Sequence, residues 1–329
     1  MIYKTNFKNY LFVLLTISMI LSCNKSEITE VIIQGNIVNP MGNTIQLVGP
    51  GEMEDGTLSL NFQRETNVDE NGNFIDTLNL KSSGYFFFIH GRERTQLFLE
   101  PGDNLTINLD SKQFDESITF SGEGSENNTF LKKRFLFQEN NGVNVIEMSK
   151  LESKEYLNQI DSLKQWELNF LKENQNISNN FINIEKKNSH YKFLQALERY
   201  PLYHEFYAKK EAVYDESFMS PLNSIDYTNQ DDYILFPDFK NLVMSYYQNK
   251  FNKSDNLKED LRKLNLSKST LIKRDLVNQG VYLLSAGNEK NKDLYETLIE
   301  LTKEFESTGI DSLTTVSYTH LTLPTKRIV

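Results

Sequence analysis

The pattern of apolar and polar positions divides the chain into a part with a period of two and a part with a helical period. In the first part, short apolar runs such as Leu105, Ile107 and Leu109 alternate with polar neighbours, and Asn, Pro and Gly separate the runs. This pattern predicts half-buried strands of an antiparallel sheet. Residues 84–89 are apolar on both faces, which predicts a central strand. We therefore expect residues 31–123 to form a β-sandwich or a barrel-like sheet.

A helical period replaces the alternation after Gly124. Apolar residues three and four positions apart predict amphipathic helices within residues 124–312, joined by Asn-rich loops. Ser125 and Ser153 are candidate N-caps, and Pro201 is expected to end a helix. The predicted fold class is therefore α+β: an antiparallel β-sandwich or barrel-like domain followed by an amphipathic helical bundle. Three more helices are predicted, over residues 239–251, 268–286 and 292–305.

The most apolar segment of the chain lies at its amino terminus. Lys4 and Lys8 precede an apolar run over residues 10–21, and the small residue Ser22 follows it. This is the pattern of a cleavable secretory signal. The run is shorter than the ~20 apolar residues that cross a bilayer. Residues 1–22 are thus predicted to be a signal peptide, and residues 23–30 a polar tether.

The end of this segment, Ile20-Leu21-Ser22-Cys23, resembles a bacterial lipobox. The resemblance implies that the Cys23 thiol receives a diacylglyceryl group before cleavage. Acyl chains hold a protein on a membrane with about 0.8 kcal/mol per buried methylene. The expected location is then the cell envelope, facing the periplasm or at the outer membrane, with the membrane as a partner through the lipid. In the alternative, the segment is a plain signal peptide and Cys23 is incidental.

Composition restricts the chemistry that the chain can perform alone. Cys23 is the only cysteine in 329 residues, so the chain has no CxxC redox pair and no thiolate cage for zinc. The net charge of -10 argues against nucleic acid as a partner. We interpret the short basic runs 132–134 and 186–187 as solvated helix faces.

No residue is assigned a catalytic, cofactor-binding or metal-binding role. Asp69, Asn71 and their neighbours alternate like a calcium loop, but Leu78 occupies the position of the required bidentate Glu. A hairpin turn at Asn71-Gly72 is the preferred interpretation. The glycines Gly122 and Gly124 lack the Lys-Ser/Thr that would follow in a phosphate loop.

The histidines and aromatic residues also lack a recognisable catalytic pattern. His190 and His204 are expected to face inward without further metal ligands, and His90 has no nucleophile signature nearby. Aromatic residues of the helical part are interpreted as packing, with a ligand groove as the alternative. These residues are Tyr200, Tyr203, Phe206, Tyr207, Tyr246 and Tyr247.

Three motifs follow one another in the first part of the chain: VDENGNF at residues 68–74, LFLEPGDNL at 97–105 and FSGEGSENN at 120–128. Their order behind the lipobox resembles the β-rich amino-terminal domain of bacterial TlpA-like thiol–disulfide oxidoreductase lipoproteins, over about residues 30–312. The resemblance implies a thioredoxin-like domain with a CxxC pair after the helical part, and protein thiols or disulfides as partners of the parent protein. The residues themselves indicate structural roles, such as a tight turn at Pro101-Gly102-Asp103.

Residues 313–329 depart from the helical period and resemble a translated sequencing-adapter tail, so we exclude them from the fold prediction. The chain is then expected to be a fragment: the membrane-anchored, non-catalytic part of a periplasmic thiol–disulfide oxidoreductase whose thioredoxin-like domain is missing. The alternative is a complete non-enzymatic lipoprotein that acts as a surface binding or assembly module. That alternative requires a native tail and a real groove in the aromatic helical part.

Overall fold

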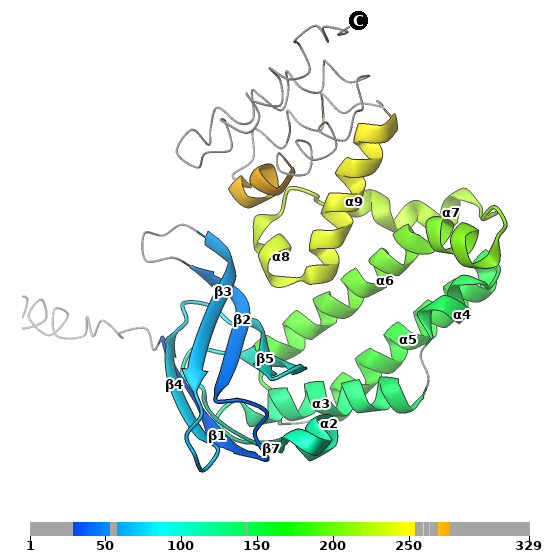
Figure 1. The fold of residues 1–329 in the computed structure, drawn as a ribbon. Coiled ribbons are helices and arrows are strands. Elements are labelled where there is room, and N and C mark those ends of the chain that lie inside the picture. Colours follow the sequence, from blue (N-terminus) through cyan, green and yellow to red (C-terminus); the bar gives the residue numbers. More distant parts are fainter. Residues whose placement is uncertain are drawn as a thin grey trace, which may run out of the picture.

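The computed structural model describes residues 29–52, 58–141, 144–174, 176–253, 259, 263 and 269–276. In these residues two sheets are followed by a helical part (Figure 1). The predicted α+β fold class is confirmed, and the sheets stack as a sandwich rather than closing into a barrel. The predicted signal peptide, Cys23, the tail 313–329 and the helix predicted at 292–305 lie outside the described residues.

The strands form two sheets of four. Their order is β4-β1-β7-β8 in the first sheet and β3-β2-β5-β6 in the second. The β1–β7 pair is parallel and departs from the predicted antiparallel pattern, because the chain enters β7 from the other sheet. The strands are β1 (Glu30–Val38), β2 (Thr44–Glu52), β3 (Leu58–Asn67), β4 (Asn73–Asn79), β5 (Gly84–His90), β6 (Glu93–Leu99), β7 (Asn104–Asp110) and β8 (Thr119–Gly122).

Alternation along the strands builds a core between the two sheets. Ile33 of β1 and Ile107 of β7 face this core, as do Phe86 and Phe88 of β5. Tyr85, the neighbour of Phe86, points the other way and belongs to a second core among the helices. Helices therefore cover the outer face of β5, which explains why this strand is apolar on both faces. Its prediction as a central strand is confirmed.

The helical part extends away from the sandwich, with α5 and α6 as long neighbours (Figure 1). Residues 270–276 are also helical, within the stretch 268–286 for which a helix was predicted. The longer elements are α3 (Ser125–Asn140), α5 (Ser153–Glu173), α6 (Asn179–Ala208) and α9 (Pro237–Lys253). Shorter ones are η1 (Ser111–Gln113), α2 (Phe114–Ser117), α4 (Val145–Ser149), α7 (Glu216–Met219), η2 (Ser220–Ser224) and α8 (Gln230–Leu235).

The prediction that a helix ends near Pro201 is wrong, because α6 continues through it to Ala208. Proline inside a helix removes one backbone donor and costs about 3 kcal/mol. Packing around the next turn offsets this cost. Tyr200 and His204 are fully buried, and His204 Nδ1 donates to the Ser149 carbonyl at 2.9 Å.

The two predicted serine N-caps are also wrong. Ser125 and Ser153 are the first residues of α3 and α5, so the capping positions are Gly124 and Glu152. Neither of these residues makes a side-chain capping bond. Gly124 instead turns the chain into the helix through a positive φ of 86°, which glycine adopts without steric cost.

Residues of the second and third motifs meet where the helices contact the sandwich, in what we call the sheet–helix joint (Phe98, Glu100, Asp103, Gly124, Asn127 and Asn128). Asn128 Oδ1 accepts from the Phe98 backbone N–H at 2.8 Å, and its Nδ2 donates to the Phe98 carbonyl at 2.9 Å. The side chain thus bonds to the edge strand β6 as a neighbouring strand would. Asn127 donates to Glu100 at 2.8 Å and accepts from the backbone N–H of Ser178.

A buried ion pair lies beside the joint. Arg134 of α3 pairs with Glu185 of α6, and the two side chains are 7% and 3% exposed. Tyr85 of β5 donates to the same Glu185 carboxylate at 2.6 Å. Burial, and next the Glu185 charge, raise the pKa of Tyr85 well above its usual range. The interpretation of residues 132–134 as a solvated face is therefore wrong for Arg134, because this charge has an internal partner.

Replacing Gly124 by Ala is expected to destabilise the joint. The added Cβ would lie 2.5 Å from an Asp103 carboxylate oxygen, and a left-handed backbone conformation costs a non-glycine residue about 1–2 kcal/mol. Gly42→Ala is the matched control, because its Cβ meets no atom within 4 Å and its φ is not positive. Urea denaturation should show a loss for Gly124→Ala alone. Equal stability of both variants would contradict this account of the joint.

Asp103 makes the joint sensitive to pH. Burial raises its pKa from 3.8 to about 6, so between these values the folded protein retains a proton that the unfolded chain has lost. The contribution of Asp103 to stability therefore falls as pH rises through this range. Asp103→Asn removes the titration and keeps an acceptor for the Glu100 N–H. Urea denaturation gives the free energy of unfolding of the parent and of the variant. The difference, parent minus variant, should decrease as the pH rises. A constant or increasing difference would refute the assignment.

Candidate functional site

A cavity of about 340 Å³ lies among the helices, between α3, α4, α5, α6 and the first turn of α9. We call it the helical cavity. Its volume lies at the lower end of the range found for small-molecule sites, about 300–1,000 Å³. Val145 at its edge is 55% exposed, so the cavity reaches the surface on the α4 side.

Apolar and aromatic side chains make up half of the residues that line the helical cavity. They come from three helices that converge because their amphipathic faces share one core. Tyr156 of α5 donates to the carbonyl of Ala196 in α6 at 2.9 Å, which fixes the two helices against each other. The apolar lining consists of Val145, Met148, Tyr156, Ile160, Leu163, Phe193, Ala196 and Tyr203.

Charged side chains line the same space. Lys164, Lys192 and Arg199 stand against the two carboxylates Glu167 and Asp238, so the lining is net positive in a chain whose net charge is -10. Lys192 pairs with Glu167 at 3.1 Å. Lys164 and Arg199 form no ion pair with any carboxylate among the described residues.

Arg199 is held in place by neutral neighbours. Its guanidinium lies 5.9 Å from the centre of the Tyr203 ring. In the amide orientation that satisfies both of its ends, Gln195 accepts from Arg199 at 3.0 Å and donates to Asp238 at 2.6 Å. Only part of the five-donor fork of Arg199 is used in this way. The rest of the fork binds no other side chain in the described part of the chain and can contact a ligand in the cavity.

Burial and the local cations set the protonation of the two carboxylates. Burial raises the pKa of Asp238 above its usual value, although Lys192 and Arg199 oppose the shift. Burial also raises the pKa of Glu167, but the positive charges of Lys192 and Arg134 have the larger effect, so the pKa of Glu167 is lowered. Glu167 therefore stays charged and paired, whereas Asp238 is the easier of the two to neutralise.

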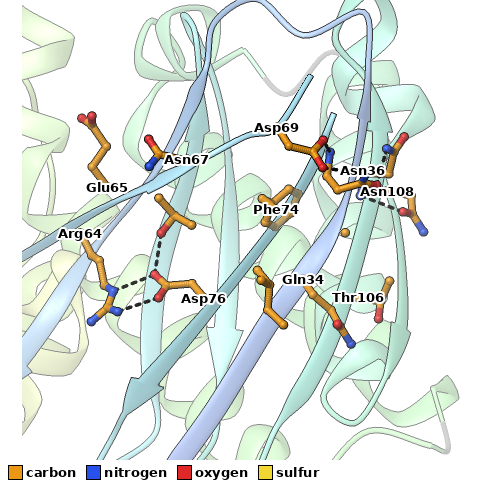
Figure 2. A pocket seen from close by; sticks show the side chains of 14 residues that line it. Gln34, Asn36, Arg64, Glu65, Asn67, Asp69, Phe74, Asp76, Thr106 and Asn108 are labelled. Carbon is orange, nitrogen blue, oxygen red and sulfur yellow. Dashed lines mark hydrogen bonds and ion pairs between the residues drawn. The ribbon is translucent and has the colours of Figure 1, made fainter. Parts of the chain in front are cut away.

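A second, wider hollow of about 1,000 Å³ lies on the outer face of the first sheet, beside β3 (Figure 2). We call it the sheet groove. Its lining is polar, with Gln34 and Asn36 of β1 and Thr106 and Asn108 of β7. Figure 2 shows these side chains on neighbouring strands, all on the same face of the sheet.

Three charged groups of the sheet groove, Arg64, Asp69 and Asp76, already have partners within the protein. Arg64 bonds both oxygens of Asp76 at 2.7 Å. Asp69 accepts from the backbone N–H groups of Asn71 and Asn73, and the bonds from Asn73 lower the pKa of Asp69 most strongly. These bonds close the turn at Gly72, whose φ is 82°, so the predicted turn is confirmed. The prediction of a hairpin is wrong, because β3 and β4 on the two sides of this turn belong to different sheets. The groove offers a ligand fewer unsatisfied charges than the helical cavity does.

The histidines do not form a site in the described part of the chain, and no group of three metal-binding side chains occurs there. His204 faces inward as predicted, but His190 is exposed on α6, and its Nδ1 lies 3.5 Å from the Lys164 ammonium. His90 is buried and joins the Met41 N–H at 2.8 Å to the Thr44 carbonyl at 2.9 Å. Its role is to hold a loop of the sandwich.

Some aromatic residues of α6 and α9 pack in the core, and another lines a cavity, so both interpretations of these residues, packing and ligand groove, apply in part. Tyr200 and Tyr247 are buried in the core, which confirms packing for them, whereas Tyr203 lines the helical cavity. Sequence reasoning did not find Lys164 or Arg199. Arg199 lies between Ala196 and Tyr203 on an otherwise apolar face of the helix. A cation in such a position is the sequence feature that could have indicated the cavity.

Comparisons with known proteins add little. No family model matches the chain, and no curated protein matches it. Among solved structures, the crystal structure of a "putative cell adhesion protein" from Bacteroides ovatus is 11% identical, with a TM-score of 0.20. The alignment covers 29% of this chain and 43% of that chain, so this chain matches less than half of its length. A likeness this distant carries no argument.

None of the described helices is long and apolar enough to cross a bilayer.

Proposed function

We propose that this chain is the lipid-anchored, non-catalytic scaffold of an envelope thiol–disulfide oxidoreductase. The observation that carries the proposal is the sheet–helix joint, in which the second and third motifs bind each other through Asn128 and Phe98. Motifs that share one joint belong to one structural unit, and their order is the basis of the resemblance to the TlpA-like lipoproteins. The sole cysteine, Cys23, serves as the attachment point in this proposal.

The anchor would hold the sandwich close to the membrane. Cys23 lies seven residues before Glu30, where β1 begins. An extended chain of that length spans about 25 Å. The joint then connects the anchored sandwich rigidly to the helices, which would position a thioredoxin-like domain that follows them. A scaffold of this kind sets the distance between the membrane and the reactive dithiol.

Reading the coding DNA beyond codon 316 in an unbroken clone tests the proposal. A CxxC pair within a βαβ pattern supports it, and a genuine stop near Val329 contradicts it. The purified chain should also show no turnover in a disulfide-reductase assay, because its single cysteine cannot form the pair that exchanges a disulfide. Robust turnover would overturn the assignment.

A second candidate function is a surface binding module that needs no catalytic partner. The helical cavity favours it, because two cations in the described lining, Lys164 and Arg199, have no carboxylate partner there. A genuine stop near Val329 together with ligand binding in this cavity would favour the module over the scaffold.

A further inference from the structure

We infer that the helical cavity binds an amphipathic monocarboxylate, with the ligand carboxylate on Arg199 and its apolar body between α5 and α6. The inference goes beyond the scaffold proposal and does not depend on it. The cavity and its lining belong to the helical part alone.

The charge balance of the lining selects an anion. Three cations face two carboxylates, and one of those carboxylates, Glu167, is already paired with Lys192. One added carboxylate would neutralise the remaining excess of positive charge in the lining. A cationic ligand would instead add to that excess in a space walled by protein, where charges interact more strongly than in water.

Arg199 is the residue best suited to contact the ligand carboxylate. A guanidinium binds a carboxylate through two parallel hydrogen bonds, which adds orientation to attraction. The Tyr203 ring and Gln195 hold this guanidinium before any ligand arrives. Lys164 contacts the Phe193 ring, six residues earlier on α6, which corresponds to about 9 Å along the helix. Lys164 therefore acts on the ligand through its field rather than by contact.

The apolar wall selects the rest of the ligand. Ile160, Leu163, Phe193 and Ala196 offer no hydrogen bond to a ligand, so the polar groups of a sugar or a short polar peptide that face this wall would lose their hydration without compensation. The volume of about 340 Å³ corresponds to roughly eleven water molecules at about 30 Å³ each. A straight or aromatic carboxylic acid with about eight to ten carbons matches both the size and the apolar character.

Isothermal titration calorimetry of the full chain with three probes of equal length tests the inference: octanoate, octanol and protonated octylamine. Octanoate is expected to bind one-to-one with a dissociation constant below about 1 mM, a value reasonable for a ligand of ten heavy atoms. Octanol should bind at least about tenfold more weakly, the size of one charge-assisted contact, and octylammonium should not bind.

Three variants locate the site. Arg199→Gln should weaken octanoate binding about tenfold and leave octanol binding unchanged. Arg92→Gln is the matched control, because Arg92 is exposed on the sandwich and should leave all binding unchanged. Ala196→Leu should fill part of the cavity and abolish octanoate binding, while a preserved unfolding transition shows that the variant folds.

Several results would overturn the inference. Equal affinity for octanoate and octanol would show that the ligand carboxylate makes no favourable contact. Unchanged octanoate affinity in Arg199→Gln would show that Arg199 does not make this contact. Unchanged binding in a folded Ala196→Leu protein would place the ligand elsewhere. Absence of saturable binding for octanoate would refute the site itself, and none of these results bears on the DNA test of the scaffold.

Discussion

Replacing Arg134 by Met is expected to destabilise the folded protein by about 3–5 kcal/mol, the usual loss when one partner of a buried ion pair is removed. Glu185 would be left at a position 3% exposed without its cation, and among the described residues its remaining hydrogen-bond donors are the Tyr85 hydroxyl and the Asn188 amide. Burying a charge without an opposite charge nearby costs far more than the pair contributed. Urea denaturation followed by circular dichroism measures the loss.

Two further variants separate this cause from a general effect of mutating α3. Lys133→Met lies on the exposed side of the same helix and should stay within about 0.5 kcal/mol of the parent. Adding Glu185→Gln to Arg134→Met removes the stranded charge and keeps an acceptor for Tyr85, so about 1–2 kcal/mol should return. A double variant less stable than Arg134→Met alone would contradict the charge argument.

The second large effect is expected for Asn128→Ala, which should cost about 2–4 kcal/mol because two buried backbone groups lose their partners. In the parent, Asn128 is fully buried and bonds the N–H and the carbonyl of Phe98 on the edge strand β6. Alanine leaves both groups away from water without a hydrogen bond. Urea denaturation gives the loss, and hydrogen exchange should show the Phe98 amide losing protection beyond the global change.

Asn140→Ala is the matched control for this variant, because Asn140 is exposed at the last turn of the same helix. It should change stability by less than about 0.5 kcal/mol. If Asn128→Ala were as mild as Asn140→Ala, Asn128 would not be the partner that the edge strand needs, and the joint would depend on apolar packing instead.

Much of the sandwich could be predicted because its signals are local. Alternation places Leu105, Ile107 and Leu109 on one face whatever else the chain does, and Asn71-Gly72 forms a turn from its own backbone preferences. Helix ends were less predictable. The helix continues past Pro201 because residues distant in the sequence bury the following turn. The residues next to the proline in the sequence give no indication of this burial.

The joint and the cavity could not be predicted because they depend on which elements meet. Arg134 follows two lysines, which is typical of a solvated face, and only Glu185, 51 positions later, makes its burial possible. Arg199 and Asp238 belong to different helices and come together through Gln195. A sequence pattern shows one face of one helix, whereas the lining of this cavity comes from five helices.

The proposed attachment of the chain to the envelope through Cys23 can be tested by the mass of the mature protein extracted from envelopes with detergent. The mature protein is expected to begin at Cys23 and to carry the added mass of a diacylglyceryl group. The Cys23→Ser protein should lack that mass and no longer fractionate with membranes. A mature protein that begins elsewhere, or one with a free thiol at Cys23, would contradict the account.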